Sequence, residues 1–243
     1  MKKKYTFLVF LLFIGISICK AQQYNYQPGY AILSDGTRIS GMIRIFDDEP
    51  WYNQRFIRIK DSAAFVKDPN VKAKLVKVDE LKYYEVAGRK YDKVHYVDLE
   101  NLQLKSLGTN DHMMERLSTG RINAHRFYQY PPDTEGYIGT EEDFKKKIEQ
   151  EKADLRRGYK ILTQKDNESK LQNAFDYDLQ KYFEDTPEVL EKYKSGGYGN
   201  QPIVKRGFAG RMIAMAKKNA FKQEEADGIV AAFNDYNSKN VAK

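Results

Sequence analysis

Two histidines and a carboxylate are the residues of this chain whose types could bind a metal ion. His112 and Glu115 are three positions apart, and His125 follows His112 by 13 positions. Imidazole nitrogens and carboxylate oxygens are ordinary zinc ligands. However, the neighbouring residues predict a loop that leads into a strand, and the HExxH pattern of helical zinc sites is missing. We therefore predict ordinary surface or half-buried histidines, with no metal and no cofactor.

Three acids, Asp47, Asp48 and Glu49, stand directly before Pro50. Hydrolysis of a glycan needs two carboxyl groups about 5 to 10 Å apart across the sugar, and a fold can bring such a pair together. Acids beside a proline are more typical of a solvated turn, which is the favoured interpretation. The chain has no GxSxG motif, so no catalytic residue is predicted, and an enzyme is the less favoured hypothesis.

An aromatic pair, Trp51 and Tyr52, follows this turn. An exposed aromatic ring in a loop can stack on a sugar, whereas a tryptophan more commonly fills the end of a β-sheet core because it supplies a large buried area. The core interpretation is favoured. The pair is nevertheless the candidate ligand-binding position of the chain.

A third candidate lies near the C-terminus. Gly207 and Gly210 have the GxxG spacing of a KH loop, but the surrounding fold pattern is missing. The residues from Arg206 to Lys222 instead predict a basic amphipathic helix. Such a helix can lie on an anionic membrane, although a helix docked on the protein with a solvated basic face is favoured.

The N-terminus has the pattern of an export signal. Lys2, Lys3 and Lys4 precede an apolar run from Phe7 to Ile18, which is too short for a comfortable membrane span. Small residues before the cut predict cleavage between Ala21 and Gln22. Lipidation of Cys19 and an uncleaved anchor remain the alternatives. Export predicts a periplasmic, outer-membrane-associated or extracellular location.

The net charge of +7 overstates the basicity of the folded part. Removing the four lysines of the leader leaves 37 basic residues against 34 acidic ones, and the residues from Ile203 onward carry eight basic residues against four acidic ones. A nucleic-acid-binding protein would need a basic face built into its fold. Nucleic acid is therefore not expected as a partner.

The elements that must position these residues are strands first and helices later. Alternating apolar residues, with turn signals such as Asp35-Gly36 and Thr119-Gly120, predict roughly seven to nine short strands. Their ranges are 30–34, 39–46, 55–60, 74–78, 81–86, 91–99, 102–107, 115–118 and 121–130. This spacing predicts an antiparallel β-meander, closed into a small barrel or folded as a sandwich.

Helical spacing dominates after Pro131. It predicts helices over 141–157, 174–183, 208–220 and 224–237, with a further strand at 159–163. The residues from Asp185 to Glu188 predict that a new helix begins there. The stretch from Ser195 to Pro202 predicts a linker. The fold class is thus α+β, with a signal peptide at 1–21, a β-rich domain at 22–135, a mixed and helical segment at 136–202, and basic C-terminal helices at 203–243.

Four stretches together resemble a family of exported proteins common in Bacteroidota. They run from Gly29 to Ile43, from Met114 to Tyr128, from Leu179 to Tyr193 and from Phe233 to Asn237. The resemblance spans most of the mature chain, and each motif is short and mainly structural. It implies a compartment and an architecture, but no activity and no catalytic residues.

This sequence departs from the family pattern at two places. His125 stands where an aromatic strand residue is expected, and the segment from Gly196 to Glu225 is longer and more basic than usual. We expect an exported, non-enzymatic binding or structural protein of the cell envelope, whose partner is an envelope protein or glycan. The alternatives are a carboxylate-dependent envelope hydrolase and a peripheral membrane protein docked by its basic C-terminal helix.

Overall fold

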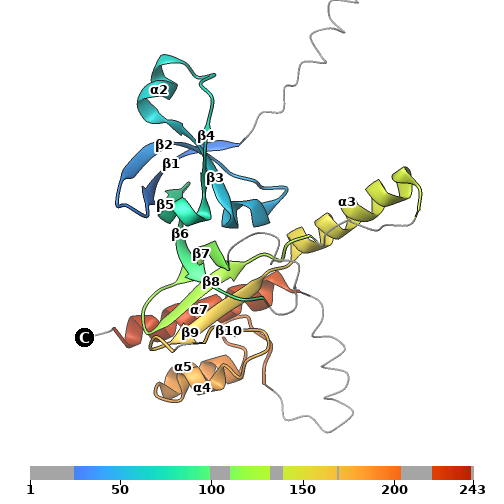
Figure 1. The fold of residues 1–243 in the computed structure, drawn as a ribbon. Helices are drawn as coiled ribbons and strands as arrows, with labels where there is room; N and C mark the ends of the chain where they lie inside the picture. Colours follow the sequence, from blue (N-terminus) through green and yellow to red (C-terminus); the bar gives the residue numbers. More distant parts are fainter. Residues whose placement is uncertain (1–24, 99–109, 132–138, 169, 204–220, 242–243) are drawn as a thin grey trace, which may run out of the picture.

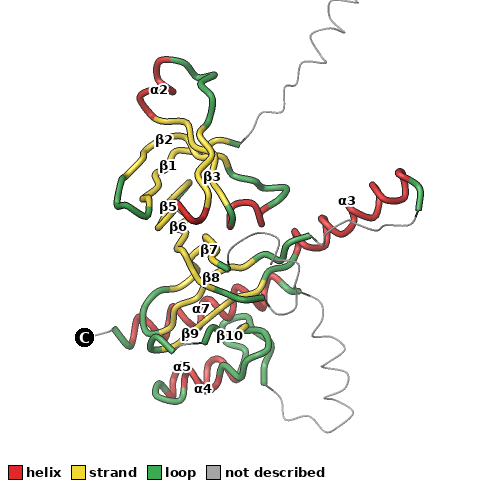
Figure 2. Tube along the Cα trace, in the orientation of Figure 1, coloured by secondary structure: helices red, strands yellow, loops and turns green. Residues whose placement is uncertain are grey.

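The computed structural model describes residues 25–98, 110–131, 139–168, 170–203 and 221–241. These residues form one antiparallel sheet of ten strands in the order β10-β9-β8-β7-β6-β5-β1-β2-β3-β4, with helices at its lower end (Figure 1, Figure 2). The strands are β1 Tyr26–Leu33, β2 Arg38–Arg44, β3 Phe56–Asp61, β4 Lys74–Lys77, β5 Leu81–Val86, β6 Arg89–His95, β7 Asp111–Ser118, β8 Ile122–Phe127, β9 Lys160–Lys165 and β10 Gln172–Asn173. The helices are η1 Pro50–Gln54, α2 Ser62–Lys67, η2 Val78–Glu80, α3 Glu141–Arg157, α4 Gln180–Phe183, α5 Pro187–Lys194 and α7 Gln223–Lys239.

The N-terminal strands curl around a core of their own. Alternation along β1 to β5 turns one face inward, and its side chains include Ala31, Ile43 and Leu81, all at most 1% exposed. Gly29 and Gly41 are cross-strand partners. A Cβ at Gly29 would lie 2.3 Å from the carbonyl oxygen of Glu85, and one at Gly41 would lie 2.0 Å from that of Lys60. Glycine at these positions therefore lets neighbouring strands approach closely enough for the sheet to bend.

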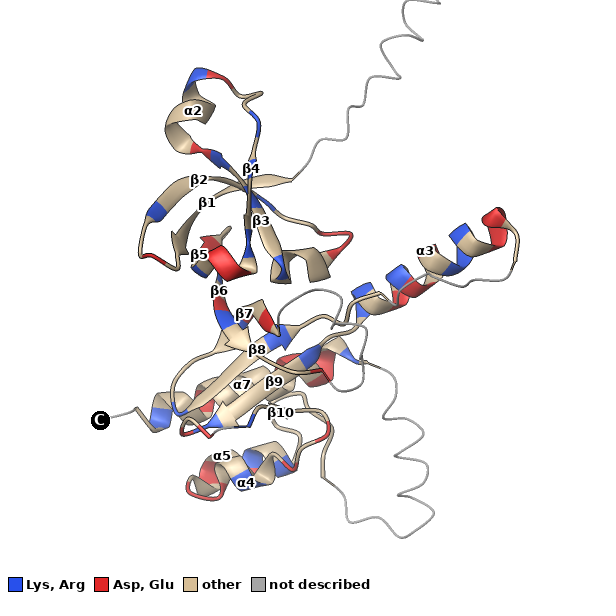
Figure 3. Cartoon of the chain, in the orientation of Figure 1, with Lys and Arg blue, Asp and Glu red and all other residues tan. Residues whose placement is uncertain are grey.

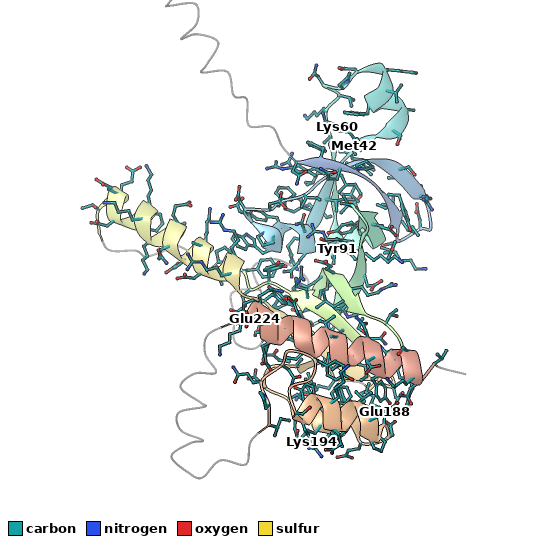
Figure 4. The ribbon with its side chains drawn as sticks, turned by 180° about the vertical axis from the view of Figure 1, so that it is seen from behind. Met42, Lys60, Tyr91, Glu188, Lys194 and Glu224 are labelled. Carbon is teal, nitrogen blue, oxygen red and sulfur yellow. The ribbon has the colours of Figure 1, made fainter. Side chains whose placement is uncertain are left out.

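Helices α4, α5 and α7 cover one face of strands β7 to β10 (Figure 1, Figure 4). Helix α7 buries its stripe of Ala226, Ile229 and Phe233 against this face. Asn237 of α7 replaces a missing strand neighbour, since its side chain accepts from the Ile122 amide at 2.9 Å and donates to the Ile122 carbonyl at 2.7 Å. This pairing fixes the helix along the sheet.

The predicted α+β class and antiparallel arrangement are confirmed. The sheet is open, with β10 and β4 at its edges, so its strands do not close into a barrel. The sheet also continues past residue 135, because β9 pairs with β8 along its whole length. Helices α3, α5 and α7 and strand β9 lie where the sequence predicts them. The predicted strand at 102–107 and helix at 208–220 lie outside the described residues.

Two local predictions are wrong. The predicted helix over 174–183 is reduced to α4, because the Asn173 carbonyl accepts from the amides of Asp176 and Tyr177 and forms a turn there. The predicted linker from Ser195 to Pro202 is packed against the fold. Asn200 is only 3% exposed, and its side-chain amide donates to the Tyr193 carbonyl at 2.8 Å.

Candidate functional site

A small polar cavity of about 100 Å³ lies where the curled N-terminal strands, strands β7 and β8, and the end of α3 meet. We call it the arginine cavity. It is lined by Ile45, Phe46, Asp47, Pro50, Asn53, Gln54, Arg89, Tyr91, Glu115, Arg126, Tyr128 and Arg156. Figure 4 shows Tyr91 at this junction. Three arginines against two acids leave an excess of positive charge in the lining.

Strand register assembles the centre of the cavity. Tyr91 of β6 pairs with Glu115 of β7, which pairs in turn with Arg126 of β8, so the three side chains form one row across the sheet. Gln54 of η1 closes one side, because its side chain accepts from the Tyr128 amide at 2.7 Å and donates to the Tyr128 carbonyl at 2.9 Å. The short helix thereby acts as an extra strand neighbour for the end of β8.

The Glu115 carboxylate lies near two guanidinium groups in this row. Arg126 Nη1 donates to Glu115 Oε2 at 3.0 Å, and Arg89 Nη1 is 3.8 Å from the same oxygen. The Glu115 and Arg126 side chains are 14% and 20% exposed. The Nε–H of Arg126 is buried and has no hydrogen-bond acceptor among the described residues. A buried donor without an acceptor costs free energy of folding, so this row of side chains is not fully hydrogen-bonded.

The surrounding phenols keep their protons. Burial raises the pKa of Tyr91 and of Tyr128, so both hydroxyls are neutral donors at physiological pH. Burial lowers the pKa of Arg126, but the negative charge of Glu115 acts against it and the pKa is raised. The Arg126 guanidinium also lies 4.5 Å from the Tyr159 ring. The cavity therefore offers fixed positive charge and hydrogen-bond donors, which suit an anion.

The acidic turn is solvated as predicted, since Asp47 and Asp48 are exposed, and it also contacts the end of α3. Asp48 accepts from Arg156 at 2.9 Å, and Glu49 accepts from Lys152 at 3.0 Å. Asp47 is part of the cavity lining. Two ion pairs between this turn and the last turns of α3 place Arg156 at the cavity.

A second hollow, of about 420 Å³, lies on β6 to β9 around Asp92, Arg116 and His125. The Arg116 guanidinium donates twice to Asp92, and His125 Nε2 is 3.1 Å from the same carboxylate. Burial opposes ionisation of Asp92, but the hydrogen bonds from His125 and Arg116 lower its pKa to about 2. The remaining ring nitrogen of His125 is buried. An ionised Asp92 held by Arg116 and His125 describes a structural network better than a general base.

The structure separates the three residues considered for metal binding. Buried His112 sits between Tyr130 and Tyr96, Glu115 pairs with arginines, and His125 pairs with Asp92. Within the ranges that the structure describes, no group of three or more histidine, cysteine, aspartate or glutamate side chains is arranged to hold a metal ion.

Trp51 is 1% exposed and packs with Met114, Phe127 and Leu162. It presents no ring face to a sugar, whereas its neighbour Tyr52 is half-buried. Residues Cys19, Ala21, Gln22 and the segment from Arg206 to Ala220 lie outside the described residues.

The cavity residues that sequence reasoning missed are Arg89, Arg126 and Arg156. Their spacing along the chain forms no motif, and only the strand register and the docking of α3 unite them. Among the helices within the described ranges, none is both long and apolar enough to cross a membrane. Comparisons with protein-family models, curated proteins and solved structures find no match to this chain.

Proposed function

We propose that this chain is a non-catalytic binding protein of the cell envelope whose arginine cavity receives the carboxylate of an acidic sugar in an envelope glycan. Its export is supported by the leader from Lys2 to Ala21 and by the family resemblance. The observation that carries the binding proposal is the meeting of three guanidinium groups, those of Arg89, Arg126 and Arg156, in the lining of one small polar cavity. Two of them, Arg89 and Arg126, share the single carboxylate of Glu115.

The shape and lining of the cavity favour a sugar acid over other anions. A volume of about 100 Å³ admits a carboxylate and the atoms next to it, but not a large apolar anchor. Asn53, Gln54, Tyr91 and Tyr128 add amide and phenol groups around the arginines. Peptide interfaces depend on buried aromatic or aliphatic anchors, whereas a polar lining suits a hydroxyl-rich ligand.

Binding is favoured over the hydrolase alternative by the carboxyl groups themselves. A glycosidase needs a carboxylic acid whose pKa is raised so that it can protonate the leaving group. Hydrogen bonds from Arg121 lower the pKa of Asp166, and hydrogen bonds from Lys239 lower that of Asp235. The pKa of Asp92 is lowered as well. These acids are held ionised, which suits ion pairs.

The test is calorimetric titration of the chain from Gln22 onward with oligogalacturonate, using the fully methyl-esterified oligomer as the matched neutral ligand. We expect the acid form to bind and the ester to bind at least about tenfold more weakly, since a charged hydrogen bond contributes about 1.5–3 kcal/mol. Equal binding of the two forms would contradict the proposal.

Two cavity variants and one surface control make the test specific. Arg126→Ala should weaken binding by about 10- to 100-fold. Glu115→Gln should tighten it by about tenfold, because the internal competitor for both arginines loses its charge. Arg58→Ala, at an exposed position on β3, should change nothing. If Arg126→Ala does not fold, the binding affinity of Glu115→Gln still tests the proposal. If an acidic peptide binds instead of the sugar and responds to the variants in the same way, the ligand is a protein partner and not a glycan.

A further inference from the structure

A finger of residues 61–75 projects from the N-terminal strands, away from the helical end of the molecule (Figure 1). It joins β3 to β4 and carries α2, and we call it the α2 finger. Asp61 caps the helix by accepting from the Ala64 amide at 3.1 Å. None of the α2 residues is buried. The finger therefore contributes little to the core of this chain, and its apolar side chains need another explanation.

The apolar side chains of the finger face solvent. Val66 is 82% exposed and Leu75 is 42% exposed. Phe65, next to Val66, is half-buried and lies against the ammonium group of Lys60 at 5.5 Å. Single exposed apolar residues are ordinary on a protein surface. Here, however, they sit on a projecting element that has no buried residue of its own.

Cations accompany these apolar side chains (Figure 3). Lys67, Lys72 and Lys74 are exposed, and none of them forms an ion pair with a residue that the structure describes. The two acids of the finger are engaged in its turns, because Asp61 caps α2 and Asp68 accepts from the Asn70 amide at 2.8 Å. Three exposed lysines thus outnumber the two acids, which are exposed but engaged with backbone amides.

The chain enters the fold beside the finger. Lys60, at the base of the finger (Figure 4), lies 5.0 Å from the ring of Tyr26 in the first strand. Cys19, the alternative lipidation position, is seven residues before Tyr26. Seven residues span at most about 25 Å. An anchor in the leader would therefore hold this side of the molecule towards the membrane.

We infer that the α2 finger inserts its Val66 tip into the interface of an anionic phospholipid membrane. A stable protein interface buries about 800 Å² on each partner, which two exposed apolar side chains do not provide. Interfacial membrane contact needs only a small apolar surface together with cations that face anionic headgroups. This surface is separate from the arginine cavity and does not depend on the glycan proposal.

The test is sedimentation of the chain from Gln22 onward with vesicles of phosphatidylcholine, alone or mixed with phosphatidylglycerol. We expect binding to the anionic vesicles that weakens with salt. Val66→Asp should reduce the partition constant by about tenfold or more, because it removes the inserted apolar group. Lys72→Gln should reduce it by roughly fivefold. Neither position is buried, so neither change should affect folding.

Val97→Asp is the matched control, since Val97 is 48% exposed outside the finger. It should bind vesicles like the unchanged chain. Three results would overturn the inference: no binding to anionic vesicles, binding that Val66→Asp leaves intact, or an equal loss in Val97→Asp. Binding that survives Val66→Asp would instead place the membrane contact elsewhere, such as the basic segment from Arg206 to Lys222.

Discussion

His112 should make this protein lose stability in mild acid. Its ring is 0% exposed and lies between the Tyr130 hydroxyl, 3.1 Å from Nδ1, and the Tyr96 carbonyl, 3.2 Å from Nε2. The neutral ring satisfies both, with Nε2–H donating to the carbonyl and Nδ1 accepting from the hydroxyl. Burial, and then the positive charge of Arg55, lower the pKa of His112 to about 4.

The magnitude follows from proton linkage. The unfolded chain has a histidine pKa of 6.5 and the folded chain one of about 4. Between these values the unfolded state binds more protons, so the free energy of unfolding falls as the pH drops from about 6.5 to about 4. Each pKa unit corresponds to about 1.4 kcal/mol, which gives a loss of about 3 kcal/mol from this residue. Well above pH 6.5, His112 is neutral in both states and does not change the free energy of unfolding with pH.

The assay is urea unfolding at several pH values across this window for the unchanged chain and for His112→Gln. Glutamine can donate and accept but does not titrate, so the unchanged chain should lose about 3 kcal/mol more than the variant as the pH falls. His95→Gln is the control, because its side chain is 69% exposed. An equal loss in the unchanged chain and in His112→Gln would refute the reasoning.

Three further substitutions test the packing by urea unfolding. Trp51→Ala should cost about 3–5 kcal/mol, because it empties a buried site that is 1% exposed, and a near-neutral result would contradict the core assignment. Asn237→Ala should cost about 2–4 kcal/mol, since it removes three hydrogen bonds that join α7 to Ile122 and Ser118; exposed Ser238→Ala is its neighbour control. Gly228→Ala should destabilise by about 1–3 kcal/mol, because the new Cβ would lie 2.5 Å from the Asn200 amide nitrogen. Stabilisation there, the usual effect of alanine in a helix, would show that the loop from Ser195 to Pro202 does not pack as described.

Local patterns predict most of the elements correctly. Period-two alternation and the Asp35-Gly36 turn predict β1 and β2, where Gly36 has a φ of 88°. The apolar stripe from Ala226 to Phe233 predicts α7. These signals succeed because they act within a few residues, where backbone sterics and the burial of one face decide the structure. The turn at Asn173 is the local exception, since side-chain and backbone hydrogen bonds there compete with helical spacing.

The arginine cavity could not be predicted in the same way. Tyr91, Glu115 and Arg126 meet only because β6, β7 and β8 pair in one register, and a shift of one residue would send the side chains to the other face. Arg156 arrives through ion pairs between α3 and an acidic turn over 100 residues earlier in the chain. Neither the register nor this docking is encoded in a local spacing.

The most direct test of the proposed function is the nitrogen-15 NMR resonance of the Arg126 Nε–H group, assigned with Arg126→Lys and followed during titration with oligogalacturonate. The account predicts a saturable shift of this resonance as a carboxylate binds beside the Arg126 guanidinium, and no such shift with the methyl-esterified oligomer. A resonance that stays in place while the acid form binds would show that the sugar acid is held elsewhere and that the arginine cavity is not the binding site.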